Sequence, residues 1–210
     1  MKRTDSMTSL LRTMRKIREY INANFTGGKN ELFVTLTYET CMTDITQLGQ
    51  DTQNFLARLK YFCQKKWERN GIFEYIWVRE VQERGAWHLH LLIKFPRKRS
   101  VYLANEDVRK IWGNGFVNVK RLKNVTNVGA YISAYLTDLV EEEQKKYYKR
   151  LENRRGHCFT KIAEKEKRVI KGGRCHLYPT GMRLFGHSKG ITPPKAFVMS
   201  YAKAKEYFGV

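Results

Sequence analysis

The chain has 210 residues, of which 42% are hydrophobic and 13% aromatic, so it is not a disordered chain and can build one substantial core. Its 40 Lys and Arg residues against 20 Asp and Glu residues give a net charge of +20, which predicts a polyanionic partner, with nucleic acid ahead of an anionic membrane surface. No apolar run approaches the roughly 20 residues of a membrane span and no apolar signal region follows the basic N-terminus, so we expect a cytoplasmic protein without a membrane partner. The four cysteines lack CxxC spacing, and we expect them to be reduced thiols.

Helical and strand-like patterns alternate along the first two thirds of the chain. The predicted elements are helix 5–25 (amphipathic and basic), strand 31–38, helix 44–67, strand 73–80, strand 86–95, helix 105–112, strand 116–120 and helix 127–140. Asp44 and Asn105 are the expected N-caps of two of these helices. Further on we expect strands 157–162 and 168–178, then a loop and a last short helix near 195–208.

This order of elements predicts the fold class. From residue 31 to 140 it reads β-α-β-β-α-β-α, the pattern of a ferredoxin-like or RRM-like α+β fold: an antiparallel sheet with helices on one face. The first and third strands are then central. We expect three parts, namely an N-terminal helix (1–30), a core (31–140) and a C-terminal extension of strands and loops packed on the same domain (141–210).

Two histidines lie two residues apart in the strand 86–95. Residues at that spacing point to the same face, so His88 and His90 project side by side while Leu89, Leu91 and Ile93 enter a core on the other face. Two imidazoles with carboxylates just across a hairpin are a candidate site for a divalent metal ion.

The third ligand of this site depends on the hairpin register. If the loop is Glu83-Arg84-Gly85, Glu80 pairs with His88 and lies on the histidine face; a two-residue loop places Val81 there instead. We favour Glu80, because the other register wastes the carboxylate. Two imidazoles and one carboxylate with open positions suit Mg²⁺ or Mn²⁺ that also binds a phosphate.

Tyr131 and Tyr135 are spaced to share one face of the helix predicted over 127–140. A tyrosine attacking a metal-polarised phosphodiester would form a phosphotyrosine bond and release a 3′-hydroxyl, and the step is reversible because the bond energy is kept. A second tyrosine would let the same site accept a second strand.

These motifs resemble those of the HUH endonucleases, in particular the replication initiators (Rep) of rolling-circle plasmids and single-stranded DNA phages. The resemblance covers roughly residues 31–140: the strand FVTLTY at 33–38, the metal motif His88-Leu89-His90 and the tyrosine pair, with Ile111-Trp112-Gly113-Asn114-Gly115 also familiar from such initiators. It implies a nickase-ligase that acts on a single-stranded origin, often in a hairpin. It also implies that His88, His90 and Glu80 bind the metal, that Tyr131 and Tyr135 are the nucleophiles, and that a separate host helicase opens the DNA.

The chain departs from the family where many relatives carry lysines beside the tyrosines, because Ala134 and Asp138 stand there. Other basic residues would then position the DNA; our candidates are Arg58, Lys65, Lys66, Arg84, Lys120, Arg121 and Lys123. Two alternatives stay open: a single-strand transposase of the same superfamily, which the second tyrosine disfavours, and a non-enzymatic module that binds single-stranded DNA or RNA on an RRM-like sheet.

Overall fold

The computed structural model describes residues 7–82, 84–122, 129, 132, 139–140, 157–162, 165–170, 177–179, 181–195, 200 and 203. Its helices are α1 (Met7–Asn24), α2 (Ile45–Trp67), the 3-10 turn η2 (Glu68–Gly71) and α3 (Asn105–Trp112). Its strands are β1 (Glu31–Thr37), β2 (Glu74–Val81), β3 (Trp87–Lys94), β4 (Val117–Arg121), β5 (Leu139–Val140), β6 (His157–Ile162), β7 (Lys165–Ile170) and β8 (Phe185–His187).

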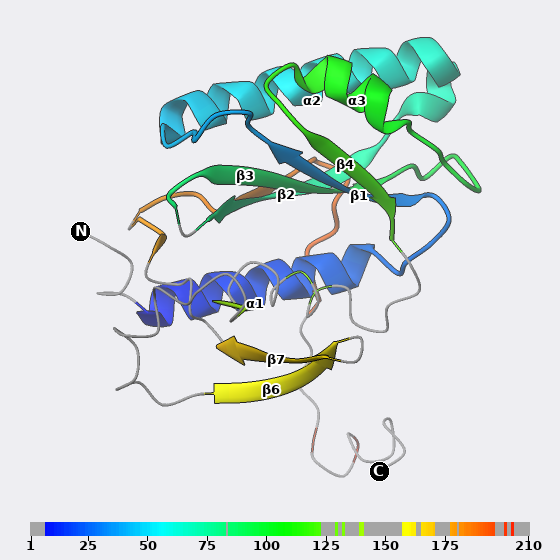
Figure 1. Cartoon of the computed structure of the whole chain (residues 1–210). Coiled ribbons are helices and arrows are strands. Elements are labelled where there is room, and N and C mark those ends of the chain that lie inside the picture. Colours follow the sequence, from blue (N-terminus) through cyan, green and yellow to red (C-terminus); the bar gives the residue numbers. More distant parts are fainter. Residues whose placement is uncertain are drawn as a thin grey trace.

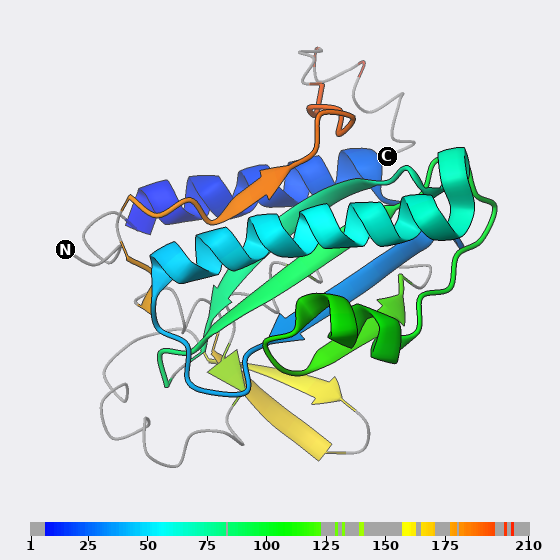
Figure 2. The ribbon, with the colours of Figure 1, turned by 90° about the horizontal axis from the view of Figure 1, so that it is seen from above.

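The main sheet has five antiparallel strands in the order β4-β1-β3-β2-β8. Helices α2 and α3 lie beside each other over one face, and α1 lies under the other (Figures 1 and 2). The predicted α+β, ferredoxin-like class is confirmed, with β1 and β3 in the middle of the four core strands. A second, three-stranded sheet, β5-β7-β6, lies on the α1 side of the molecule (Figure 1).

The α2 face of the sheet holds the larger core. Val34 and Leu36 of β1 alternate with polar residues, pair with Leu91 and Leu89 of β3, and are buried with them, as predicted for the β3 leucines. Helix α2 covers this face with a stripe that includes Leu48, Phe55 and Leu59, and its N-terminus is capped by Asp44, whose carboxylate accepts from the N–H groups of Thr46 and Gln47.

Helix α1 covers the opposite face, which is the face of the histidines. Lys94 lies on that face of β3, and its ammonium donates to the carbonyl of Asn24 at the C-terminal end of α1. Near the edge of the sheet formed by β8, Tyr20 of α1 stacks on His187, the last residue of β8, at 5.0 Å between ring centroids. Three fully buried residues of α1, Leu10, Ile17 and Ile21, fill the space between the helix and the sheet.

Several boundaries differ from the sequence prediction. Helix α3 begins at Asn105, and Ala104 is its N-cap; the Asn105 side chain instead accepts from the N–H of Val119 at 2.6 Å. The strand expected over 168–178 runs over 165–170, and the last two residues of the predicted helix 127–140 form the strand β5 instead. The terminal helix expected near 195–208 lies almost entirely outside the described residues.

The largest omission is β8, which falls in a segment predicted to be a loop. Its three residues extend the main sheet by pairing with β2, with Val78 opposite Phe185. Cys41 and Cys63 carry free thiols, in line with the expected reduced thiols. Among the described helices, none has the length and apolar character needed to cross a membrane.

Candidate metal centre

The hairpin between β2 and β3 sets the geometry of the site. Glu80 lies directly opposite His88, and the N–H of Gln82 donates to the carbonyl of Ala86 at 2.8 Å. This is the three-residue loop, so the register that we favoured is confirmed and the alternative with Val81 opposite His88 is wrong. Gly85 closes the turn with φ of +84°, a conformation that glycine adopts without strain, and its N–H donates to the carbonyl of Gln82.

Three ligand atoms converge beneath the sheet. One oxygen of Glu80, Oε2, lies 2.6 Å from Nε2 of His90 and 3.8 Å from Nδ1 of His88. The three potential ligand atoms all lie within 4.8 Å of one another. Two atoms bound to one Mg²⁺ ion at about 2.1 Å lie about 3 to 4 Å apart. Small side-chain rotations would therefore bring the three ligand atoms to the spacing of a metal coordination shell. The group could therefore hold a metal ion.

The burial of the cluster supports that role. Glu80, His90 and His88 are exposed by 2%, 0% and 8% of their surface. A carboxylate buried this deeply must be compensated, and a divalent cation shared with two neutral imidazoles provides more compensation than a hydrogen bond alone. His88 is the most exposed of the three side chains.

Two residues of β1 orient His90. Oγ1 of Thr35 lies 3.2 Å from Nδ1 of His90, and the Phe33 ring stacks on the imidazole at 5.5 Å and 5°. If Nε2 binds the metal, Nδ1 carries the proton and donates to the Thr35 hydroxyl, which fixes the tautomer and the ring plane. The sequence motifs assigned no role to Phe33 and Thr35. Alternation along FVTLTY puts both on one face of β1, and the β1–β3 register identifies that face as the one of the histidines.

Tyr131, Tyr135 and Lys123 lie outside the described residues. Two neighbours of the tyrosines are described: Gly129 and Ile132, which are helical and buried. The N–H of Gly129 donates to the side-chain oxygen of Asn22 at 2.9 Å. Gly129 therefore contacts α1, the helix that covers the face of the metal cluster.

Another tyrosine close in sequence to the site is excluded as a nucleophile. Tyr38 follows β1 but packs against Trp112 in the core on the α2 face. Burial, and a hydrogen bond of 2.8 Å from its hydroxyl to Asp51, raise the pKa of Tyr38 far above its usual value. Its phenol stays protonated, and the side chain contributes to the packing of the core.

The candidate DNA-binding residues lie on both sides of the sheet. Arg84 is in the turn of the metal hairpin, and Lys120 is opposite Phe33 on the metal face of β4. Arg121 is opposite Leu32 and so belongs to the other face. The three candidates of α2 are on that other side as well: Arg58, Lys65 and Lys66. The structure thus brings two of the described candidates to the metal face and leaves four behind the sheet.

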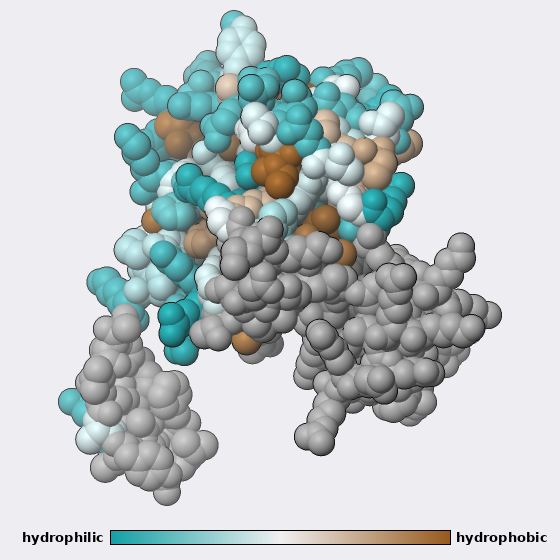
Figure 3. Space-filling model, turned by 90° about the vertical axis from the view of Figure 1, so that its left-hand side faces the viewer, coloured by the Kyte–Doolittle hydropathy of each residue, from teal (hydrophilic) through white to brown (hydrophobic). Residues whose placement is uncertain are grey.

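The described surface on the side of the molecule seen in Figure 3 is mainly hydrophilic. In Figure 3, apolar residues of the described surface form small separate patches between polar ones. The open, aromatic sheet of an RRM-like module is absent from the middle of the described sheet, because α1 covers the metal face and α2 the other. This arrangement speaks against the reading as a non-enzymatic RRM-like module.

A family model described as replication-associated protein ORF2/gene 2 protein matches residues 31–140, which are 110 of the 210 residues. The matched region includes the metal cluster, the tyrosine pair and the whole β1–β4 core. Searches of curated proteins and of solved structures gave no significant match.

Proposed function

Because the chain belongs to this family of replication-associated proteins, we propose that it is a metal-dependent endonuclease that nicks and rejoins single-stranded DNA to initiate rolling-circle replication. The buried cluster of Glu80, His88 and His90 is the observation that carries the proposal. Packing of a core does not require two imidazoles and a carboxylate to converge at one end of a sheet. Metal-dependent cleavage of a phosphodiester does require such a set of ligands.

In the proposed site Glu80, His88 and His90 would hold Mg²⁺ or Mn²⁺, and the ion would supply Lewis-acid polarisation of the scissile phosphate. His90 is held by Phe33 and Thr35, so the donor set is pre-arranged before DNA arrives.

Tyr131 or Tyr135 supplies the nucleophile. Its phenolic oxygen attacks phosphorus, the bond between phosphorus and the 3′ oxygen breaks, and that oxygen leaves with a proton as the free 3′-hydroxyl. The 5′ end stays linked to the tyrosine, and attack by a 3′-hydroxyl reverses the reaction and joins strands. The contact between Gly129 and α1 supports a position of this segment on the metal face.

The proposed partners are a single-stranded origin, presented as a hairpin or open strand, and a separate helicase of the host. The proposed place of action is the cytoplasm, because cysteines stay reduced there and the DNA substrate is present there. The large positive charge supports binding to the phosphate backbone.

Covalent trapping tests the proposal. End-labelled single strands that tile both strands of the DNA encoding the chain are incubated with the protein and Mn²⁺, then separated on a denaturing gel. We expect a protein–DNA adduct with one tile, and its loss with EDTA or in His90→Ala. Adduct formation that persists in His90→Ala would contradict the assigned metal site, and absence of an adduct from every tile would contradict the activity.

Tyrosine variants identify the nucleophile. Tyr131→Phe and Tyr135→Phe are made singly and together, with Tyr102→Phe as the matched control, since Tyr102 is 77% exposed and outside the cluster. We expect the double variant to abolish the adduct and the control to form it at the wild-type level. The DNA next to the mapped nick then separates an initiator, which has an origin hairpin, from a transposase, which has transposon ends.

A further inference from the structure

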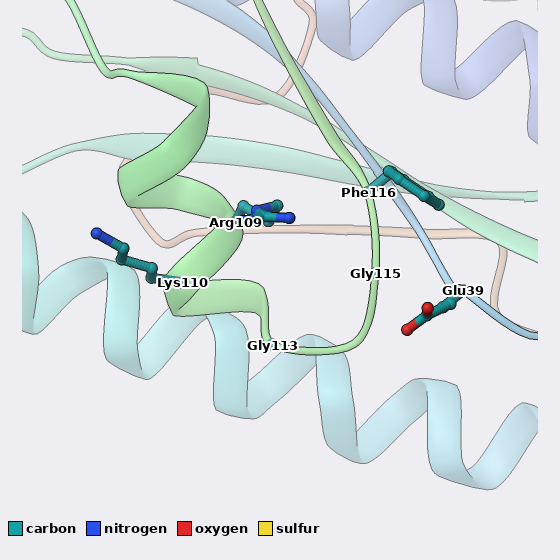
Figure 4. A pocket seen from close by; sticks show the side chains of 6 residues that line it. All are labelled: Glu39, Arg109, Lys110, Gly113, Gly115 and Phe116. Carbon is teal, nitrogen blue, oxygen red and sulfur yellow. The ribbon is translucent and has the colours of Figure 1, made fainter.

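A surface pocket lies where α3 passes into β4. Six residues line this α3–β4 pocket, which has a volume of about 340 Å³: Glu39, Arg109, Lys110, Gly113, Gly115 and Phe116. It contains the glycines of the Trp112-Gly113-Asn114-Gly115 run, which has no role in the metal cluster. In Figure 4, Arg109 and Glu39 point toward the loop 113–116 from its two sides, and Lys110 points away from Arg109.

The loop is fixed to the end of β1. Both the N–H and the hydroxyl of Thr37 donate to the carbonyl of Phe116, at 2.9 and 3.2 Å, and the N–H of Glu39 donates to the carbonyl of Asn114 at 3.0 Å. The indole of Trp112 donates to the carbonyl of Thr37 at 2.9 Å. These bonds make the pocket part of the rigid sheet rather than a free loop.

The same contacts locate the pocket relative to the metal cluster. Thr37 is directly opposite His88 in the β1–β3 ladder, and Phe116 is bonded to Thr37 on its other side. His88 and Phe116 are therefore two strand spacings apart, or about 10 Å. Alternation along β4, where Lys120 and Phe33 share the histidine face, assigns Phe116 to that face too.

The lining has the chemistry of a nucleotide site. Phe116 is 65% exposed, so its ring is accessible for stacking against a base. Arg109 is exposed and forms no ion pair with any described residue, whereas Lys110 is paired with Glu106 at 2.9 Å. Glu39 offers a carboxylate that can accept from an exocyclic amino group but would repel a phosphate.

We propose that the α3–β4 pocket binds one nucleotide of the single strand, close to the phosphate held at the metal cluster. The base stacks on Phe116, its amino group donates to Glu39, and a backbone phosphate pairs with Arg109. Cytosine, adenine and guanine then bind better than thymine, which lacks an amino group. The position next to the nick rests on the proposed function, while nucleotide binding by the pocket does not.

Binding without cleavage tests the pocket. Fluorescence anisotropy in EDTA measures the affinity for labelled 20-nucleotide single strands of mixed sequence and for oligothymidine. We expect Phe116→Leu to weaken mixed-sequence binding by about fivefold or more, as for the loss of one base–aromatic stack, and Tyr102→Leu to have no effect. Glu39→Gln should reduce the preference for mixed sequence over oligothymidine.

Salt dependence separates the stacking contact from the ionic one. Arg109→Gln should lower the slope of log Kd against log salt by about 0.7, the value for one phosphate contact on a single strand, and Phe116→Leu should leave the slope unchanged. Arg99→Gln, at an exposed position away from the pocket, is the control for general loss of charge. Equal effects of Arg109→Gln and Arg99→Gln, or of Phe116→Leu and Tyr102→Leu, would overturn the proposal.

The two proposals fail independently. A covalent adduct without any dependence of binding on Phe116 would leave the nickase in place and remove the pocket. Binding that depends on Phe116 without an adduct on any tile would support the nucleotide pocket and contradict the nickase activity. Circular dichroism of each variant confirms that the fold is retained.

Discussion

At the scale of single residues, Glu80 is the side chain on which the metal cluster depends. Its Oε2 atom faces both imidazoles, and among the described residues of the cluster it is the acidic one. We expect Glu80→Gln to lower the affinity for Mn²⁺ at least about tenfold, because the neutral amide keeps the shape but loses the charge that attracts the ion. Isothermal titration calorimetry measures this affinity.

The control for this variant is Glu106→Gln, which removes an exposed carboxylate of α3 that pairs with Lys110. It should bind Mn²⁺ as the wild type does. An unchanged Mn²⁺ affinity of Glu80→Gln would show that the carboxylate is not a ligand and that its bond to His90 is purely structural.

Glu31 is a second buried carboxylate, and its role is to join α1 to β1. It is 1% exposed, accepts from the N–H groups of Thr26, Gly27 and Gly28 at 2.8 to 3.2 Å, and pairs with Lys94 at 3.3 Å. Glu31→Ala should lower the free energy of unfolding by about 3 kcal/mol, because three donors and an ammonium lose their acceptor.

Urea denaturation measures this loss, with Glu106→Gln again as the control, which removes an exposed ion pair and should change stability far less. Glu31→Gln, which keeps one acceptor oxygen, should fall between the wild type and Glu31→Ala. A loss for Glu31→Ala no greater than that of the control would mean that water replaces the carboxylate at this junction.

At the scale of elements, the docking of the 113–116 loop on β1 depends on Gly115. A methyl group there would lie 2.5 Å from the nitrogen of Glu39 and 2.6 Å from the carbonyl oxygen of Thr37, and φ is +153°. Gly115→Ala should therefore cost about 2 kcal/mol or more, since backbone must move. Gly85→Ala should cost about 1 kcal/mol, because φ is also positive but the nearest atom is a methyl carbon of Thr43 at 3.8 Å. Thermal unfolding compares the two; equal losses would show that the loop is not tightly seated.

The elements also show how far the sequence predicts the fold. Strand β1 and helix α2 follow from period-2 and period-3.6 patterns, because each has one face in a core large enough to impose the pattern. Strands β2 to β4 follow from their runs of β-branched and aromatic residues. The hairpin register could not be read from the pattern, since Glu80 and Val81 both suit a strand end. Only the chemical argument that a carboxylate belongs near His88 selected the observed pairing.

The features that the sequence prediction missed share one physical cause: each depends on a contact with a residue far away in the sequence. Asn105 has the sequence of an N-cap, but its amide oxygen is taken by the N–H of Val119, 14 residues away. Strand β8 has three residues and a glycine in the middle; it exists because β2 offers an open edge, and the ring of Trp77 packs against Gly186. The hydroxyl of Thr35 acquires its role from His90, 55 residues away.

At the scale of the whole molecule, the charge of +20 is spread over both sides of the sheet. Lys120 and Arg84 lie toward the metal cluster, whereas Arg58, Lys65 and Lys66 line α2 behind it. Some of the latter are also engaged locally: Lys66 pairs with Asp107 at 3.4 Å, and Arg58 donates to the carbonyl of Ile111. The two groups lie on opposite faces of the sheet, so we expect them to contribute differently to DNA binding.

The triple variant Arg58→Gln/Lys65→Gln/Lys66→Gln tests this division. If the α2 side holds flanking DNA by charge alone, the slope of log Kd against log salt should fall by up to about 2, which is three contacts of about 0.7 each, for any sequence. The single-turnover rate of adduct formation at saturating DNA should stay that of the wild type, because no member of the trio reaches the metal face. Lys120→Gln is the matched variant on that face, and it should lower the salt slope by about 0.7 and slow adduct formation as well. If the triple variant slows the saturated reaction as much as Lys120→Gln does, the α2 side takes part in positioning the scissile strand, and the path of the DNA must cross the edge of the sheet.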